Sequence, residues 1–229
     1  MDIRAILFDA GNTLIFLDSS VVLPILHEHG IDSDRETFID AELDARAKLT
    51  RRVLDGAFGT EPHIWKEYFG TLFKGCGVPD EEMEAVGEHV YEVHRERHLW
   101  TYMDPATPAV LDRLKGDGYR LAVISNADGR VEGLLQEAGI RDRFEFVMDS
   151  EIEGVEKPDP EIFLRGCRRL GLPPENVLYV GDLYPVDVLG ARKAGLNAVL
   201  LDPRNRMDFP VDCLPDVAAL PGYMGQLST

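Results

Sequence analysis

The sequence is poor in positive charge. Its 229 residues include 24 Lys and Arg against 41 Asp and Glu, which gives a formal net charge of −17. Nucleic acids and anionic membranes both attract basic surfaces, so this balance argues against either as a partner. The sequence also has no apolar run of about 18 residues, no basic leader and no small-residue cleavage site. We therefore expect neither export nor membrane insertion.

Cysteine is scarce as well. The three cysteines, Cys76, Cys167 and Cys213, lie far apart and show neither CxxC nor metal-ligand spacing. Such sparse cysteines favour a reduced, cytoplasmic protein over a disulfide-stabilised one. Hydrophobic residues make up 45% of the chain and charged residues 28%, which is typical of a soluble globular protein. We expect a monomer or a homodimer, between which the sequence does not decide.

Five short apolar runs rich in β-branched residues predict strands. They lie at 5–9, 121–125, 144–148, 176–181 and 197–201. Helical segments separate the later runs and end at Gly139, Gly171 and Gly195. Strands that alternate with helices indicate a parallel sheet covered on both faces, which is an α/β, Rossmann-like fold.

Residues 17–100 have a different pattern. Helical periodicity recurs there at about 21–29, 34–55, 62–74 and 80–99, without a comparable strand-like run. We therefore expect an α/β core domain of residues 1–16 and 101–229, interrupted by a mostly helical domain at 17–100. All six histidines fall inside this insert: His27, His29, His63, His89, His94 and His98.

Polar residues gather at the predicted strand ends, where ligands bind in open α/β sheets. They are Asp9, Ser125, Asn126, Lys157, Asp182 and Asp187. Three carboxylates that close together need a cation, and a hard divalent ion such as Mg²⁺ suits their oxygen ligands. Ser125 at a helix N-terminus and the ammonium group of Lys157 favour an anion, and phosphate is the anion that we expect.

Four segments of the chain, in order, resemble the motifs of a known family. They are FDAGNTL at 8–14, ISN at 124–126, KPDPEIF at 157–163 and VGDLYPVDVLGARKAG at 180–195. In this order and at strand ends, they resemble the motifs of the haloacid dehalogenase-like hydrolase superfamily. The resemblance covers the whole α/β portion of the chain, and the insert looks like the helical cap that this superfamily places between its first two motifs.

The resemblance implies a Mg²⁺-dependent hydrolase of small phosphorylated molecules. By this resemblance Asp9 would be the nucleophile that forms an aspartyl-phosphate, and Ser125, Asn126 and Lys157 would hold the transferring group. Mg²⁺ would bind Asp9, Asp182 and the main-chain carbonyl of Gly11, with Asp187 in or just outside the first coordination shell. Thr13 would be a supporting residue, and Tyr184 would lie at the mouth of the cleft.

One position departs from the pattern. Phosphatases of the superfamily usually carry a second Asp two residues after the nucleophile, where this sequence has Gly11. The metal contact at that position uses the backbone, so the expected loss is that of a general acid and base, worth about 10²–10⁴ in rate. We therefore expect weak activity on alkyl phosphates and better activity on esters with good leaving groups.

The same departure leaves alternatives open. A cap histidine such as His27 or His63 would be one replacement for the missing acid. Phosphonate hydrolases of the superfamily use a cap lysine as a Schiff base, and the insert contains Lys48, Lys66 and Lys74 without a matching motif. Haloacid dehalogenases need no acid but lack the acidic pair found here at 182 and 187. A regulatory protein that binds a phosphorylated ligand with little turnover is the third alternative.

Two polar groups in the insert have simpler interpretations. His94 and His98 have metal-ligand spacing on a predicted helix, but the neighbouring Glu and Arg favour a solvated helix face. The basic cluster at 46–52 faces an anionic substrate in one interpretation. In the other it forms i,i+4 pairs, Glu42 with Arg46 and Asp44 with Lys48, which the spacing favours. Trp65, Tyr68 and Phe69 are interpreted as core of the insert.

Overall fold

The computed structural model describes residues 2–56, 62–206 and 208–227. The chain forms two compact units. The core unit comprises the chain up to residue 15 and from residue 103 onward, and the insert unit comprises residues 16–102. None of the helices among the described residues combines the length and apolar character that a membrane crossing requires.

A six-stranded parallel sheet organises the core unit. In spatial order it contains β5 (Val147–Asp149), β4 (Arg120–Ser125), β1 (Ala5–Phe8), β6 (Val177–Gly181), β7 (Asn197–Leu201) and β8 (Cys213–Leu214). This arrangement confirms the α/β, Rossmann-like fold. The central strands β1 and β6 are buried at every residue, as expected for a sheet with helices on both faces.

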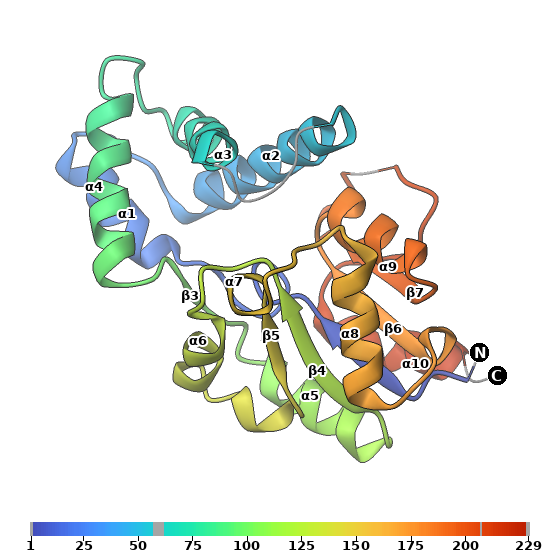
Figure 1. Cartoon of the computed structure of the whole chain (residues 1–229). Helices are drawn as coiled ribbons and strands as arrows, with labels where there is room; N and C mark the ends of the chain where they lie inside the picture. The colour runs from blue at the N-terminus through green and yellow to red at the C-terminus, as the bar shows by residue number, and fades with distance from the viewer. Residues whose placement is uncertain (1, 57–61, 207, 228–229) are drawn as a thin grey trace. The chain divides into compact units, whose positions relative to one another are not determined.

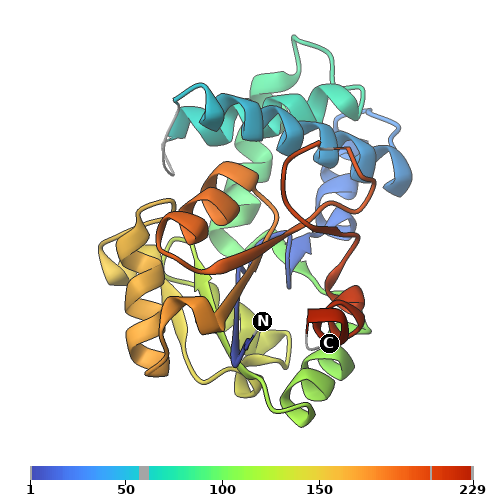
Figure 2. The same ribbon diagram turned by 90° about the vertical axis from the view of Figure 1, so that its right-hand side faces the viewer.

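Helices cover the two faces of this sheet (Figures 1 and 2). On one face lie α8 (Pro160–Leu170) and α9 (Leu189–Lys193), whose apolar residues join alternate residues of β1, β4, β6 and β7 in one buried cluster. On the other face α5 (Thr107–Gly116) and α10 (Leu220–Leu227) lie side by side. The shorter α6 (Val131–Glu137) and α7 (Ser150–Glu153) follow β4 and β5.

Helix α8 begins and ends at the residues that its sequence indicates. The side chain of Asp159 accepts a hydrogen bond from the backbone N–H of Glu161, and Pro160 occupies the first helical position. The helix ends at Gly171, whose φ of 63° lies in the left-handed region that glycine adopts without strain. The segment after Lys157 is therefore a rigid support for that side chain.

Strand β5 lies further along the chain than expected. The apolar run at 144–148 predicts a strand, but the strand occupies Val147–Asp149. A 3₁₀ turn at Arg141–Arg143 delays it, because the backbone N–H of Phe144 donates to the Arg141 carbonyl and the Arg141 side chain donates to the Phe144 carbonyl. The shift makes Asp149 the last residue of the strand, level with Ser125 on β4.

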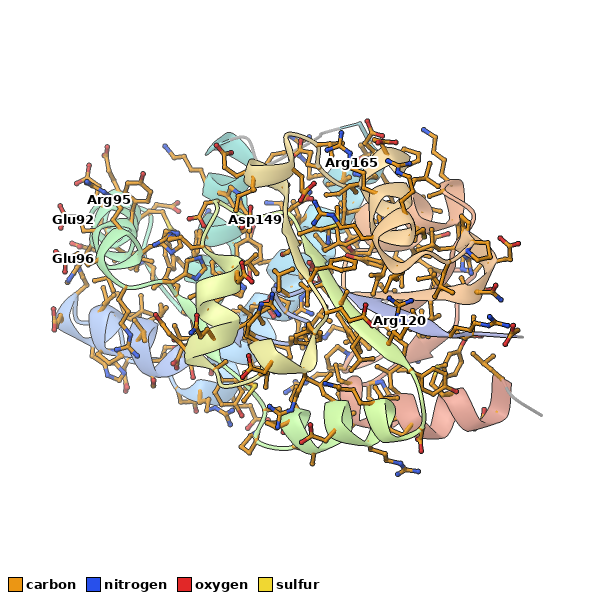
Figure 3. The ribbon with its side chains drawn as sticks, turned by 60° about the horizontal axis from the view of Figure 1, so that its bottom comes forward. Glu92, Arg95, Glu96, Arg120, Asp149 and Arg165 are labelled. Atoms are coloured by element: carbon orange, nitrogen blue, oxygen red, sulfur yellow. The ribbon has the colours of Figure 1, made fainter. Side chains whose placement is uncertain are left out.

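The insert unit contains four helices among its described residues. They are α1 (Ser19–Glu28), α2 (Arg35–Leu54), α3 (Pro62–Gly75) and α4 (Met83–Glu96). Figure 3 labels Glu92, Arg95 and Glu96 on α4, and all three are exposed. The unit also has a feature that the sequence did not predict, a two-stranded antiparallel ladder of β2 (Phe16–Leu17) and β3 (Trp100–Tyr102).

Candidate active site

Three adjacent strands bring the predicted site residues of the core unit together. Strand β1 lies between β4 and β6. Asp9 directly follows β1, and its backbone N–H donates to the Val180 carbonyl of β6 at 2.8 Å. Ser125 is the last residue of β4, and Asp182 directly follows β6. This is the edge of an open parallel sheet at which ligands bind.

A tight loop follows Asp9. The backbone N–H groups of Leu14 and Ile15 donate to the Ala10 carbonyl, and Asn12 donates to the Ile15 carbonyl at 2.7 Å. Asn12 has a φ of 53°, a left-handed conformation that asparagine adopts more readily than most residues. Gly11 lies inside this hydrogen-bonded turn, two residues after Asp9.

The Lys157 side chain enters this cluster from the loop before α8 and is only 2% exposed. Its Nζ atom lies 2.8 Å from Asp9 Oδ1 and 2.7 Å from Asp187 Oδ1. It also lies 2.9 Å from the hydroxyl oxygen of Tyr179. A buried ammonium group needs such partners, because an unpaired charge in the protein interior is costly.

Asp187 reaches the cluster through a π-helical turn at Tyr184–Val188. Its Oδ2 atom accepts hydrogen bonds from the backbone N–H groups of Asp182 at 3.1 Å and Leu183 at 2.9 Å. Both of its carboxylate oxygens therefore already have partners, the second one being Lys157. Asp187 thus holds the 182–187 loop and the lysine in place, and its remaining lone pairs are available to a cation.

The electrostatics of the cluster are dominated by burial. Burial raises the pKa of Asp9, the charge of Lys157 opposes that rise, and the charge of Asp187 adds to it. For Lys157, burial alone would lower the pKa, but the charges of Asp187 and Asp9 outweigh burial and raise the pKa well above its usual value. The ammonium form of Lys157 is therefore stabilised, while the carboxylates lack full charge compensation.

This donor set fits a hard divalent cation. Asp9, Asp182 and Asp187 are buried, and each offers an oxygen within 4.8 Å of those of the other two. Three ionised carboxylates carry two more negative charges than the single positive charge of Lys157 compensates. A cation with oxygen ligands, such as Mg²⁺, matches both that excess and the ligand type.

Asn126 has a more specific place than the sequence suggested. Its side-chain Nδ2 donates to the Lys157 carbonyl, and its Oδ1 accepts from the Lys157 backbone N–H, both at 2.8 Å. The amide thus ties the end of β4 to the loop that carries the lysine. The Asn126 amide nitrogen keeps one further N–H group, which is free to donate to a phosphate oxygen. That contact stays a prediction.

Sequence reasoning missed Asp149, which organises the loop after Ser125. Asp149 lies at the end of β5 (Figure 3) and is buried. Its Oδ2 accepts from the backbone N–H of Gly129 at 3.0 Å and of Val131 at 3.4 Å. The neighbouring Ser150 hydroxyl accepts from the N–H of Ala127. With a strand predicted at 147–149, Asp149 and Ser150 would have been recognised as polar residues at a strand end.

Sequence reasoning also missed Tyr179, because a tyrosine inside an apolar strand has the pattern of a core residue. It is fully buried at the third position before Asp182. Two other residues of the core unit are buried. Tyr184 stacks on Phe209 with ring centroids 4.0 Å apart, and Thr13 is 1% exposed. Both lie close in sequence to the acidic residues without a charged partner in the described structure.

Three members of the basic cluster of the insert unit form ion pairs. Arg46 is buried and pairs with Glu42, which confirms the expected i,i+4 contact. Glu42 also accepts a hydrogen bond from the Tyr68 hydroxyl at 2.8 Å. Lys48 and Arg52 pair with Glu67 on α3. These contacts join α2 to α3 inside the unit.

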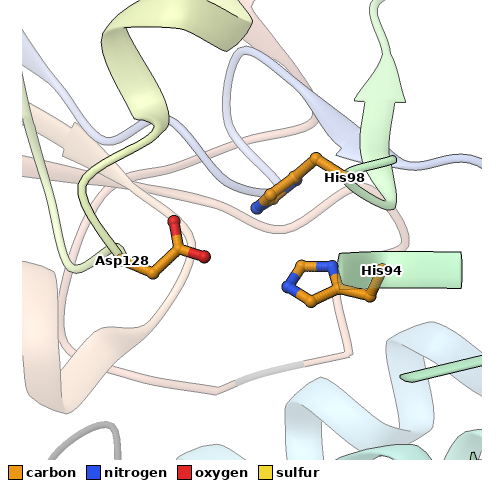
Figure 4. Close-up of side chains that lie close together, drawn as sticks. All are labelled: His94, His98 and Asp128. Carbon is orange, nitrogen blue, oxygen red and sulfur yellow. The ribbon is translucent and has the colours of Figure 1, made fainter. Parts of the chain in front are cut away.

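The histidines of the insert unit have local partners. His94 and His98 lie with ring centroids 4.6 Å apart (Figure 4). They do not share a helix, because α4 ends at Glu96 and His98 accepts a hydrogen bond from the backbone N–H of Trp100. His27 contacts the Ser33 carbonyl at 3.1 Å. The side chain of His63 lies outside what the structure describes.

Comparisons with known proteins agree on one family. The model of haloacid dehalogenase-like hydrolases matches residues 3–195. The haloacid dehalogenase-like hydrolase domain-containing protein 3 of Mus musculus is 34% identical over 164 residues, 71% of this chain and 65% of that protein. The glyceraldehyde 3-phosphate phosphatase of Methanopyrus kandleri is 30% identical over 225 residues, 91% of each chain.

A solved structure shows the same fold. The putative HAD-hydrolase YfnB of Bacillus subtilis, bound to magnesium, has a TM-score of 0.70 and 17% identity, with 98% of this chain and 99% of that chain covered. This chain therefore shares its fold with that structure.

Proposed function

Because the chain belongs to the haloacid dehalogenase-like hydrolase family, we propose that it hydrolyses a small phosphorylated molecule through an aspartyl-phosphate on Asp9, with Mg²⁺ as its metal. The observation that carries the proposal is the Lys157 ammonium group, held 2.8 Å from Asp9 among buried carboxylates. A relative that is 30% identical over nearly its whole length is a phosphatase of glyceraldehyde 3-phosphate. The chain would act in the cytoplasm, as a monomer or homodimer.

The reaction consists of two displacements at phosphorus. In the first, an oxygen of Asp9 forms a bond to phosphorus as the bond to the leaving oxygen breaks, which gives the aspartyl-phosphate and an alkoxide or phenolate that takes its proton from solvent. In the second, water attacks phosphorus and regenerates Asp9 with release of phosphate. Lys157 and the hydroxyl of Ser125 would bind oxygens of the transferring group, because a cation and a donor lower the energy of that negatively charged group.

The metal would be held by Asp9, Asp182 and the Gly11 carbonyl, with Asp187 as a ligand or as support through the 182–187 loop. When bound, Mg²⁺ supplies positive charge against the phosphoryl oxygens and orients them toward the nucleophile. The protein's own part is orientation: the bonds from Asp182 and Leu183 to Asp187 fix that carboxylate, and Lys157 links it to Asp9.

Gly11 determines which substrates suit the site. Glycine has no side chain to protonate a leaving alkoxide or to activate water, and this proton transfer is worth about 10²–10⁴ in rate. Aryl phosphates and other esters whose leaving groups need no proton should therefore be cleaved far faster than alkyl phosphates. The aspartyl-phosphate should also accumulate if its hydrolysis lacks a base.

Phosphate release from an aryl and an alkyl phosphate, with Mg²⁺ and with chelator, tests the proposal. We expect Mg²⁺-dependent release, faster from the aryl ester, and none from Asp9→Asn. The matched control is Asp112→Asn, which alters an exposed aspartate paired with Arg143 and should keep full activity. If the wild type releases no phosphate, the proposal is wrong.

The alternatives are then tested directly. Chloride release from a haloacid without Mg²⁺ would indicate dehalogenation, and borohydride trapping of a carbonyl substrate on a lysine would indicate phosphonate cleavage. Thermal stabilisation by inorganic phosphate without turnover would indicate a binding protein.

A further inference from the structure

The buried hydroxyl of Tyr179 joins two parts of the site. Tyr179 lies in the middle of β6 and is fully buried. Its hydroxyl donates a hydrogen bond to the Ile124 carbonyl on β4 at 2.8 Å and accepts one from Lys157 Nζ at 2.9 Å. The hydroxyl therefore connects the lysine to the residue that directly precedes Ser125.

Packing alone does not require this hydroxyl. The Tyr179 ring meets Phe163 of α8 edge to face, with centroids 4.9 Å apart, and the surrounding cluster is apolar. A phenylalanine ring would make the same contact, whereas burying a hydroxyl costs free energy unless it is hydrogen-bonded. The tyrosine is thus explained by its two polar partners.

The direction of the two hydrogen bonds is fixed. A hydroxyl has one proton, and here it goes to the Ile124 carbonyl, so a lone pair faces the ammonium group. Lys157 donates two of its three N–H groups, one to Asp187 and one to Tyr179. Its Nζ atom forms an ion pair with Asp9 at 2.8 Å, but Asp9 Oδ1 accepts no hydrogen bond from the described residues. The third N–H group therefore stays available to a phosphoryl oxygen.

We infer that Tyr179 is a positioning residue that holds the Lys157 ammonium group in the orientation needed at Asp9. The inference rests on the proposed function. Without the neutral acceptor, the ammonium group would be held by the two carboxylates alone and would turn toward them. Asp9 would then be more strongly engaged by the lysine, and a phosphoryl oxygen would find no N–H aimed at it. The expected consequence is a slower chemical step with little change in substrate affinity.

Tyr179→Phe tests this in the full chain, with an aryl phosphate and Mg²⁺. A hydrogen bond to a charged group is worth a factor of about 10–100, so we expect kcat to fall by about that factor while KM changes less than threefold. The matched control is Tyr223→Phe, which removes a tyrosine hydroxyl that donates to Asp212 elsewhere in the core unit and should leave both parameters unchanged. An unchanged kcat in Tyr179→Phe would overturn the inference.

A double-mutant cycle separates positioning from a structural role. If Tyr179 acts through the lysine, Tyr179→Phe should cause no further fall in the residual kcat of a Lys157→Met background. Independent effects that simply add would contradict the inference.

NMR of the lysine side chain gives a readout that does not depend on activity. In ¹⁵N-labelled protein, the buried Lys157 ammonium should give a slowly exchanging ¹H–¹⁵N signal, assigned by its loss in Lys157→Met. We expect Tyr179→Phe to shift or broaden this signal and Tyr223→Phe to leave it unchanged. A signal unaltered in Tyr179→Phe would overturn the inference even if the wild type proved inactive, whereas inactivity with an altered signal would overturn only the proposed function.

Discussion

The side-chain amide of Asn126 pairs with the backbone of Lys157 through two hydrogen bonds, one in each direction. The pairing resembles one rung of a strand ladder, with a side chain in place of one backbone. It fixes the main chain at the lysine, while Tyr179, Asp9 and Asp187 fix its ammonium group. Both the main chain and the ammonium group of Lys157 are therefore held in place. A site with a nucleophile requires such a fixed geometry.

Asn126→Asp should be more harmful than Asn126→Ala. Alanine removes two hydrogen bonds, a loss of about 2 kcal/mol in the free energy of unfolding. Aspartate keeps the shape but places an oxygen against the Lys157 carbonyl, so we expect a further loss of about 1–2 kcal/mol. Denaturant unfolding measures both.

The control for this pair is Asn197→Ala. The side-chain amide of Asn197 also donates to a backbone carbonyl, that of Glu175, but this hydrogen bond is exposed to solvent. It should cost less than about 1 kcal/mol and leave phosphate release intact. An Asn126→Asp variant as stable as wild type would show that the two bonds do not form in solution.

Gly11→Asp should restore the missing proton transfer. We expect turnover of an alkyl phosphate to rise by about 10²-fold or more, with a much smaller gain on an aryl phosphate, because only the poor leaving group needs the proton. Steady-state phosphate release on both esters measures the ratio. No gain on the alkyl ester, with Mg²⁺ binding retained, would mean that another residue already supplies the acid.

Gly181→Ala should displace Asp187. A Cβ atom at this position would overlap the Asp187 side chain, so the carboxylate would have to leave the backbone N–H groups of Asp182 and Leu183. We expect a loss of about 1–3 kcal/mol in stability and a strong loss of Mg²⁺ affinity. Calorimetric titration with Mg²⁺ measures the second effect.

The matched glycine is Gly222 in α10, where a Cβ atom would meet nothing within 4 Å. Gly222→Ala should leave Mg²⁺ binding unchanged and stabilise the helix by up to about 1 kcal/mol. Equal Mg²⁺ affinity in the two alanine variants would refute the account of Gly181.

Cys167 should make the protein sensitive to alkali. Burial raises the pKa of its thiol from 9.0 to about 11. Between these values the unfolded chain releases the proton and the folded chain keeps it, so the free energy of unfolding falls as pH rises, by up to about 3 kcal/mol. Urea unfolding at pH 8.5 and pH 11 should show this fall in the wild type and a smaller one in Cys167→Ala. Equal falls in the two proteins would contradict the assignment.

The sequence predicted the position of the acidic and basic groups better than their partners. Asp9, Asp182 and Lys157 could be placed because strand ends in a parallel sheet meet at one edge, a consequence of strand period and topology alone. The partners of Asn126 and Tyr179 could not be placed. Both depend on side-chain directions across neighbouring strands, and a tyrosine inside an apolar run has the same pattern as a core residue.

The missed ladder of β2 and β3 has a similar cause. Leu17 and Trp100 are far apart in the sequence, and strands of two or three residues leave no periodic signal. The shifted β5 shows the opposite limit. Its apolar run was visible, but the backbone N–H of Phe144, the first residue of that run, takes part in a local turn.

The ladder at Phe16 and Tyr102 also determines how the chain tolerates its long insertion. Because the Asp18 N–H donates to the Leu99 carbonyl and the Thr101 hydroxyl donates to the Asp18 side chain, the two ends of the insert unit lie together. Closing a loop costs entropy that grows with its length, but a folded insert whose ends already meet is equivalent to a short hairpin. The α/β sheet can thus accept inserts of very different size at this point, and exchange of the insert is a modular change.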